Sequence, residues 1–253
     1  MDTVKVMLCG VSGAMGQTVI SCASAMDDIR IVTGFDALEC HENFPVYTDI
    51  TEITEEADVV IDFSHKSVTD TITKWCMEHK KPLVSAVTGI SEGSEAYIKE
   101  AANEIAVIRS TNFSYGVYVL NKLVYEAARL LDEGYDIELT EAHHNKKADA
   151  PSGTAKTLLG NIDRARGFTS DKVYTRNGEC KRTKGEIGVH ALRGGTISGE
   201  HTVLFAGDDE LIEIKHSAAS KKIFGNGALN AAKFLKGKPA GIYTMDDIAR
   251  EKN

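Results

Sequence analysis

Short apolar runs alternate with amphipathic segments through the first 113 residues of the chain. The apolar runs predict strands at "VKVMLC", "IRIVTGF", "ADVVIDFS", "PLVSAV" and "IAVIRS". The segments between them predict helices at "GQTVISCASAM", "SVTDTITKWCMEHK" and "SEAYIKEAANE". Strands that are almost continuously apolar and alternate with helices are typical of a parallel sheet in an α/β domain. We therefore predict a Rossmann-like parallel sheet for this part of the chain.

The pattern changes near residue 114. A long helix, "GVYVLNKLVYEAARLLDEG", leads to a strand of alternating polarity, "YDIELTEAHH", and then to a helix at about 153–166. Three more alternating strands follow at "EIGVHALRGG", "GEHTVLFAG" and "ELIEIKHSA". Short alternating strands with glycine turns predict an α+β domain whose sheet is mainly antiparallel and covered on one face.

The last segment, "GALNAAKFLKG", is helical again, and we place it back on the first domain. The chain contains no internal repeat or low-complexity linker. The predicted organisation is a dinucleotide-binding domain at 1–113, an inserted domain at 114–222 and a returning segment at 223–253. We expect the inserted domain to bind the substrate and to form the contacts between subunits.

Composition and charge narrow the class of partner. The net charge of −8 at a pI near 5.5 argues against nucleic acid, and no apolar run is long enough to span a membrane. The cysteines are odd in number and form no CxxC pair, and the N-terminus lacks a signal peptide, so we expect free thiols and a cytoplasmic location. The cysteines are Cys9, Cys22, Cys40, Cys76 and Cys180.

A glycine-rich stretch, "CGVSGAMG", follows the first predicted strand and opens a helix. Gly10, Gly13 and Gly16 permit a tight turn, and the free N–H groups at a helix start attract a pyrophosphate. Ser12 stands where the usual fingerprint has its second glycine, which leaves open that the loop is only a tight connection. The strand-loop-helix context favours dinucleotide binding.

Asp36 closes the second predicted strand, where a carboxylate can accept hydrogen bonds from an adenosine ribose. No Lys or Arg occurs between Asp36 and Tyr47 to balance a 2′-phosphate. The sequence therefore favours NADH over NADPH. The alternative is that Asp36 simply ends a strand.

The densest group of titratable residues is "EAHHNKKADAPSGTA", residues 141–155. His143 and His144 are adjacent in a predicted strand, so they point to opposite faces, and there is no HExxH spacing. We therefore predict no metal site, although the five histidines of this domain leave one open, as does an ordinary solvated surface. They are His143, His144, His190, His201 and His216.

The same stretch predicts an anion seat beside a proton donor. Ser152 can cap the helix that begins at Gly153 and Thr154, whose N–H groups suit a carboxylate. Lys147 adds a positive charge or a proton, and a histidine is the residue best suited to act as a general acid near neutral pH. With a nicotinamide domain, this indicates an NAD(P)H-dependent reductase of a small anionic substrate.

The string "EAHHNKKADAPSGTA" resembles the signature of the dihydrodipicolinate (4-hydroxy-tetrahydrodipicolinate) reductase family of lysine and diaminopimelate biosynthesis. The resemblance extends over the chain through "GVSGAMG", "DFS", "VTG", "NFSYGV", "RGGTISGEH" and "IFGNGALNAAKFL". It implies reduction of 4-hydroxy-2,3,4,5-tetrahydrodipicolinate to tetrahydrodipicolinate by NADH or NADPH. It also implies a homotetramer built through the sheet of the second domain.

The resemblance also assigns individual residues. His143 resembles the catalytic acid/base and Lys147 the proton donor, and His144, Gly153 and Thr154 resemble ligands of the substrate carboxylates. Residues in four places match nucleotide contacts: Gly10, Val11, Ser12, Gly13, Ala14 and Met15; Asp36; Ala86, Val87 and Thr88; and Ser110, Thr111, Asn112 and Phe113. The chain departs from many relatives at Ala14 and Ala37, where an arginine is common. Both changes support a preference for NADH. Ala86-Val87 replaces a more usual Gly-Thr, with a consequence for nicotinamide contacts that the sequence does not define.

Three questions stay open at this point. Arg193 is a candidate ligand of a substrate carboxylate, but Gly194-Gly195 after it indicates a hairpin turn and favours a structural role. A semialdehyde dehydrogenase would need a placed thiol, and Cys9 and Cys76 fall inside a strand and a helix. A nucleotide-sensing protein without catalysis is the other alternative.

Overall fold

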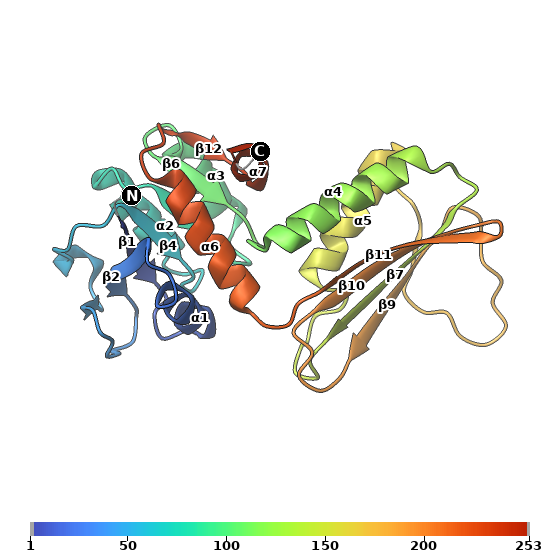
Figure 1. Cartoon of the computed structure of the whole chain (residues 1–253), viewed down its shortest axis with the longest axis horizontal. Coiled ribbons are helices and arrows are strands. Elements are labelled where there is room, and N and C mark those ends of the chain that lie inside the picture. The colour runs from blue at the N-terminus through green and yellow to red at the C-terminus, as the bar shows by residue number, and fades with distance from the viewer. Residues whose placement is uncertain (1–2, 252–253) are drawn as a thin grey trace. The chain divides into compact units, whose positions relative to one another are not determined.

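The computed structural model describes residues 3–251, which form two compact units (Figure 1). One unit holds residues 1–114 together with 221–253, and the other holds residues 115–220. Each unit has its own sheet and its own hydrophobic core. Among the helices formed by residues 3–251, none is both long and apolar enough to cross a membrane.

The first unit is built on a seven-stranded sheet in which every pairing is parallel. Its strand order is β12-β6-β5-β4-β1-β2-β3. The strands are β1 (Val4–Cys9), β2 (Ile29–Phe35), β3 (Val46–Tyr47), β4 (Val59–Asp62), β5 (Leu83–Ser85), β6 (Ala106–Arg109) and β12 (Gly241–Tyr243). The order reverses beside β1, so that β1 and β4 flank the point at which dinucleotides bind in such sheets.

Helices cover both faces of this sheet, as the continuous apolar strands require. One core packs side chains of α1 (Ala14–Ala23) and α6 (Lys222–Leu235) against the sheet, and the other packs those of α2 (Thr69–Glu78) and α3 (Glu92–Ala101). A short helical turn, η1 (Ile50–Glu52), and a last helix, α7 (Met245–Glu251), complete the unit.

The second unit contains a five-stranded sheet with the order β11-β10-β7-β9-β8. Its strands are β7 (Asp136–His143), β8 (Lys172–Val173), β9 (Ile187–Arg193), β10 (Glu200–Gly207) and β11 (Glu210–Ser217). The pairs β7–β10 and β10–β11 are antiparallel, whereas β7–β9 and β8–β9 are parallel. The sheet is mixed because α5 (Gly153–Arg166) carries the chain across from β7 to β8 and β9, and such a crossover makes parallel neighbours.

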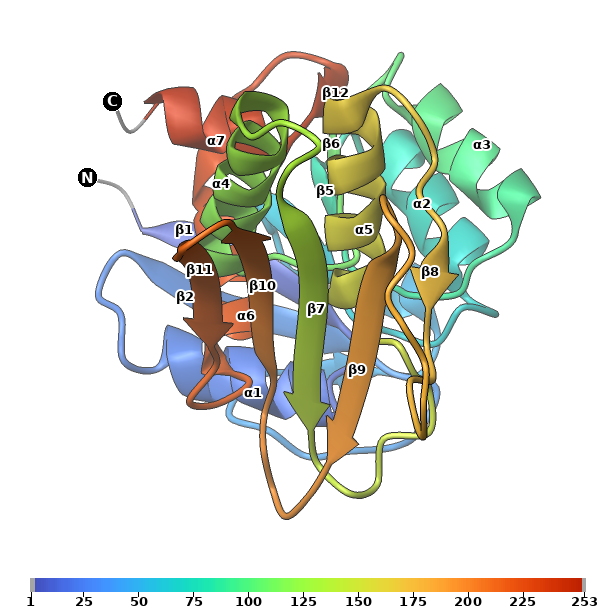
Figure 2. The same cartoon turned by 90° about the vertical axis from the view of Figure 1, so that its right-hand side faces the viewer.

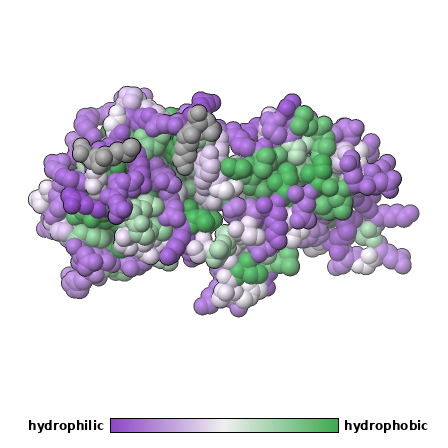
Figure 3. Space-filling view, viewed as in Figure 1, coloured by the Kyte–Doolittle hydropathy of each residue, from purple (hydrophilic) through white to green (hydrophobic). Residues whose placement is uncertain are grey.

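Helices α4 (Tyr115–Leu130) and α5 pack on one face of this sheet, which stands in front of them in Figure 2. The alternation of β7 explains the sidedness, because Ile137 and Leu139 are buried while Asp136 is exposed. Apolar side chains remain exposed along α4 at Val119, Leu123 and Leu130, where Figure 3 shows a hydrophobic band. The predicted fold class, a Rossmann-like domain plus an α+β domain with one covered face, is confirmed.

One local prediction is wrong. Gly194-Gly195 does not form a hairpin, because β9 and β10 are not neighbours: β7 lies between them in the sheet. The chain instead turns at Gly195, with φ of 47°, and runs through residues 194–199 past the end of β7 to reach β10. The backbone N–H of Gly194 donates to the carbonyl of His143, so this connection lies against the end of β7.

Candidate active site

The residues predicted to contact a nucleotide follow the carboxyl ends of β1, β2, β5 and β6. Because all these strands are parallel, their carboxyl ends meet at one edge of the sheet. Four stretches that are far apart in the sequence therefore gather at the edge where open α/β sheets bind their ligands. They are 10–15, Asp36, 86–88 and 110–113.

The glycine loop is held in a shape that only glycine permits. Gly10 has φ of +83°, and a Cβ there would lie 2.5 Å from the carbonyl oxygen of Phe63. A Cβ on Gly16 would lie 2.1 Å from the carbonyl oxygen of Gly10, so α1 can start this close to β1 only with glycine. Gly13 caps α1 without a side-chain hydrogen bond, and the first turn carries no acidic residue. This leaves the helix start suited to an anion.

Asp36 fastens this loop to the end of β2. One carboxylate oxygen accepts hydrogen bonds from the backbone N–H of Ser12 at 2.7 Å and from its hydroxyl at 2.9 Å. The other oxygen accepts from the N–H of Leu38 at 3.0 Å. The carboxylate therefore fixes the loop as well as standing where a ribose is expected. The Ser12 contact explains what a serine does in the place of the fingerprint's second glycine.

The other predicted contact residues differ in what they expose. Val11, Ala86 and Val87 are buried, whereas Thr88 and Thr111 are exposed. Ser110 and Asn112 form a small turn, in which the Ser110 hydroxyl donates to the carbonyl of Asn112. Phe113 is 2% exposed and its side chain lies in the core, so any nucleotide contact there would come from its backbone.

Sequence analysis did not single out Asp62, which ends β4 at the same edge of the sheet. The side chain is fully buried, and burial raises the pKa of its carboxyl to about 6, although hydrogen bonds from Ser64 act in the opposite direction. A buried carboxyl with a raised pKa beside the glycine loop is a feature that apolar periodicity cannot reveal, because the strand "VVID" looks like any other strand that ends in aspartate.

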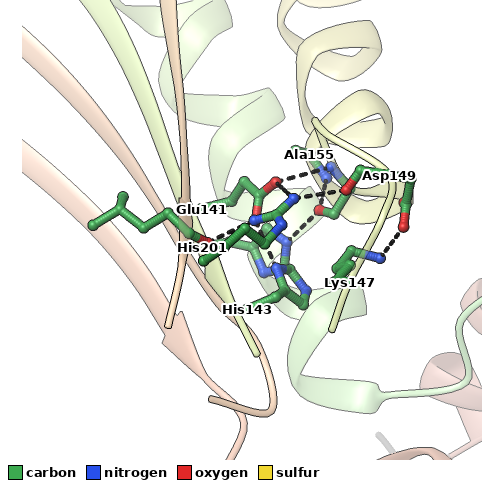
Figure 4. A network of polar contacts seen from close by, with 9 residues as sticks. Glu141, His143, Lys147, Asp149, Ala155 and His201 are labelled. Atoms are coloured by element: carbon green, nitrogen blue, oxygen red, sulfur yellow. Dashed lines mark hydrogen bonds and ion pairs between the residues drawn. The ribbon is translucent and has the colours of Figure 1, made fainter. Parts of the chain in front are cut away.

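In the second unit, the predicted acid/base residue stands at the end of β7 with a buried carboxylate beside it (Figure 4). Glu141 and His143 lie on the same face of the strand because they are two residues apart. Nδ1 of His143 lies 2.6 Å from Oε2 of Glu141, whose side chain is 0% exposed. A methyl group on Gly199 would lie 3.1 Å from Nε2, so glycine leaves that edge of the ring uncrowded.

Arg193 holds the same carboxylate from the neighbouring strand. Its two terminal nitrogens each donate to one oxygen of Glu141 at 2.8 Å, a bidentate pair. Burial alone raises the pKa of Glu141, but the hydrogen bonds from Arg193 and His143 outweigh it, and the pKa lies below its ordinary value. The guanidinium is thus occupied by Glu141. The structural role that sequence analysis favoured for Arg193 agrees with this geometry.

The start of α5 is joined to this cluster through Ser152. The Ser152 hydroxyl accepts a hydrogen bond from the N–H of Ala155, as expected of a helix cap, and the Ser152 N–H donates to Glu141 at 3.1 Å. Gly153 and Thr154 form the first turn of α5, and a Cβ on Gly153 would meet no atom within 4 Å. The predicted anion seat therefore borders open space at Gly153.

Lys147 and His144 lie in the loop between β7 and α5. Nζ of Lys147 donates to Asp149 at 2.7 Å, and its backbone N–H donates to the carbonyl of His144 at 3.1 Å. The lysine is the first cause of the lowered pKa of Asp149. His144 directly follows the last residue of β7, and its carbonyl, through the Lys147 contact, helps to shape the loop.

His201 is a further member of the cluster, in register with Glu141 on the adjacent strand β10. Its Nε2 lies 2.9 Å from the Ser152 hydroxyl, and its ring meets that of His143 edge to face, with centroids 5.2 Å apart. Burial, followed by the nearby His143, lowers the pKa of His201 to about 4. His201 is therefore neutral at physiological pH, and any positive charge forms on another group.

Sequence analysis named the local members of this site and missed the distant ones. Glu141 carried a usable signal, because an acidic residue two positions before His143 in a strand shares its face. Arg193 and His201 lie 52 and 60 residues beyond Glu141 in the sequence and carried none that a single chain reveals. Among residues 3–251, no group of three or more His, Cys, Asp or Glu side chains could hold a metal ion.

Two family models match the chain. The model for the dihydrodipicolinate reductase C-terminus matches residues 116–249, and the model for its N-terminus matches residues 4–113. The chain belongs to the dihydrodipicolinate reductase family. The two matches together include both units and therefore both parts of the candidate site.

Known family members resemble the chain over nearly its whole length. A 4-hydroxy-tetrahydrodipicolinate reductase of Caldanaerobacter subterraneus subsp. tengcongensis is 45% identical, with 98% of this chain and 99% of the relative covered. One from Clostridium tetani is 43% identical over 96% of each chain. A dipicolinate-bound dihydrodipicolinate reductase from Paenisporosarcina sp. TG-14 has a TM-score of 0.79 at 22% identity, covering 96% of this chain and 97% of that one. That likeness supports the fold.

Proposed function

We propose that this chain reduces 4-hydroxy-2,3,4,5-tetrahydrodipicolinate to tetrahydrodipicolinate, with loss of water, as an NAD(P)H-dependent oxidoreductase of diaminopimelate and lysine biosynthesis. The relatives that match almost end to end carry the name of this activity. The observation in the chain that carries the proposal is the second-unit cluster, in which a histidine, a lysine and the capped start of α5 come together (Figure 4).

Each part of the cluster suits one part of a dicarboxylate substrate. We propose that the N–H groups of Gly153 and Thr154 receive one carboxylate, since a helix start favours negative charge. His144 is proposed to bind a substrate carboxylate as well. His143 is the proposed acid/base, and Lys147 the proposed proton donor, which would exchange its contact with Asp149 for one with the substrate. A reduced nicotinamide supplies the hydride when bound, so the protein's own task is orientation and proton transfer.

We propose that NADH is preferred over NADPH. Asp36 presents a carboxylate where the ribose is expected, and Ala14 and Ala37 supply no cation for a 2′-phosphate. A 2′-phosphate beside an ionised carboxylate would meet repulsion without a compensating charge. We expect kcat/KM to be higher with NADH by about tenfold, which corresponds to about 1.4 kcal/mol. Equal values, or a preference for NADPH, would contradict this reasoning.

A coupled assay tests the activity itself. Pyruvate and aspartate semialdehyde are condensed by a synthase, and the loss of NADH absorbance is followed when this chain is added. We expect oxidation of NADH that depends on the synthase, on both of its substrates and on this chain. NADH binding without turnover would instead favour a nucleotide-sensing protein of the same fold.

We also propose a homotetramer formed through the sheet of the second unit. Within residues 115–220, α4 and α5 cover one face of that sheet, and Leu192 and Leu211 remain 52% and 69% exposed on its strands. Exposed leucines on a sheet that is helix-covered on one face only are suited to contact another copy of the chain. Light scattering measures the mass directly, and a monomer at micromolar concentration would contradict the proposal.

A further inference from the structure

We propose that Glu141 is a positioning residue for His143: its carboxylate selects the imidazole tautomer and stabilises the protonated ring, and Arg193 keeps that carboxylate charged. The inference rests on the role of His143 in the proposed function. It concerns a residue that would not touch the substrate and acts only through the histidine.

The first argument is the direction of the hydrogen bond between Glu141 and His143. An ionised carboxylate only accepts, so Nδ1 of His143, 2.6 Å away, must be the donor. A neutral imidazole carries one proton, and placing it on Nδ1 leaves Nε2 as the free base or, after protonation, as the acid. The crowding test at Gly199 shows that the ring edge with Nε2 is the one left unobstructed there.

The second argument is that the carboxylate has no acceptor capacity left over. Oε1 accepts from the Ser152 N–H at 3.1 Å and from Arg193 at 2.8 Å, and Oε2 accepts from Arg193 at 2.8 Å and from His143. Four accepted hydrogen bonds match the capacity of an ionised carboxylate. Every donor stabilises the charged form, which is why a fully buried Glu141 remains ionised.

The third argument separates this arrangement from an ordinary buried ion pair. An Arg–Glu pair alone would not need a histidine at 2.6 Å or a link to a helix cap. Here the N–H of Ser152, the residue that caps α5, binds Glu141, so the proton site and the proposed carboxylate seat are parts of one rigid cluster. His201 on the other side of His143 is neutral, so Glu141 is the group that opposes a charge on His143.

The test uses Glu141→Gln in the full chain. An amide both accepts and donates, and its single oxygen cannot serve Arg193, Ser152 and His143 together, so the other tautomer of His143 becomes available. We expect kcat to fall by about 10² to 10⁴-fold, while KM and the Kd for NADH change by less than about threefold. The matched control is Glu186→Gln, which removes a buried carboxylate paired with Arg176 at the opposite end of β9. It should leave kcat within about threefold.

A spectroscopic measurement keeps the proposal independent of activity. In the full chain carrying ¹⁵N-labelled histidine, two-bond ¹H–¹⁵N spectra report which ring nitrogen holds the proton, and His143→Asn identifies the signal. We expect wild-type neutral His143 to carry it on Nδ1, and Glu141→Gln to change that. A wild-type proton on Nε2 would overturn the inference even if Glu141→Gln failed to fold. So would equal losses of kcat in both glutamine variants, or an unchanged tautomer in Glu141→Gln. An inactive wild-type chain would refute the proposed function and leave the tautomer result standing.

Discussion

Turnover is expected to fall by about 10² to 10⁴-fold when His143 is replaced with asparagine or Lys147 with alanine, because each change removes a group proposed to move a proton. Asparagine at 143 can still donate to Glu141, so the cluster keeps its main hydrogen bond while losing the titratable ring. NADH binding should be retained, because the predicted nucleotide contacts belong to the other compact unit. Steady-state kinetics and fluorescence titration with NADH measure the two effects separately.

The matched control for Lys147 is its neighbour Lys146. Lys146 is exposed, whereas the side chain of Lys147 is 20% exposed and paired with Asp149. Lys146→Ala removes the same charge one position earlier and should change kcat by less than about threefold. If both lysine variants lost activity equally, the loss would reflect the net charge of the loop, and the role given to Lys147 would be wrong. Wild-type rates in His143→Asn would remove the histidine from the mechanism.

The second large effect is expected for stability. Arg193→Leu strands the buried carboxylate of Glu141, and breaking a buried pair by removing one partner costs about 3–5 kcal/mol. Arg129→Leu is the control, because Arg129 pairs with Glu126 on the surface of α4, where both side chains are 51% exposed. Its loss should stay within about 1 kcal/mol. Hydrogen exchange of the β7 amides measures the effect in the second unit. The single tryptophan, Trp75, lies in the first unit, and its unfolding midpoint should not move.

The difference between wild type and Arg193→Leu should depend on pH. In the wild type, the pKa of Glu141 is lowered, so its contribution to stability is present above the unfolded pKa and is lost as pH falls through the folded pKa. In the variant, the unpaired carboxylate destabilises the fold while it is charged, and protonation relieves this. The gap in the free energy of unfolding should therefore be wider at about pH 7.5 than at about pH 5. A gap that stays constant over this range would assign the loss to packing.

Much of the fold follows from local pattern. The predicted helix at about 153–166 is α5, Gly153–Arg166, because Ser152 caps its start and Gly167, with φ of +76°, ends it. The strands missed by sequence reasoning are short edge strands, β3, β8 and β12, which have two or three residues each and too few positions for a period. The mixed pairing of the second sheet was also hidden, because strand direction depends on which strands become neighbours across a crossover.

The site divides in the same way. His143, Lys147 and the start of α5 come from one stretch of 15 residues, so their composition alone indicated an anion and a proton. Arg193 and His201 reach Glu141 only because β9 and β10 flank β7 in register. Ser12 looked like a departure from a motif and is explained by its hydrogen bonds to Asp36. Contacts between distant strands are the information that a single sequence does not contain.

The interrupted first unit has a consequence for biosynthesis on the ribosome. Its core includes Ala228, Leu229 and Leu235 of α6, and its sheet ends with β12, both of which are translated after residues 115–220. The inserted unit is one continuous segment and has emerged in full before the unit that precedes it can close. Domains usually complete folding in the order of synthesis, from the N-terminus. Here that order is reversed, and a nascent chain halted near residue 220 would hold a finished inserted unit and an open apolar face on the first sheet.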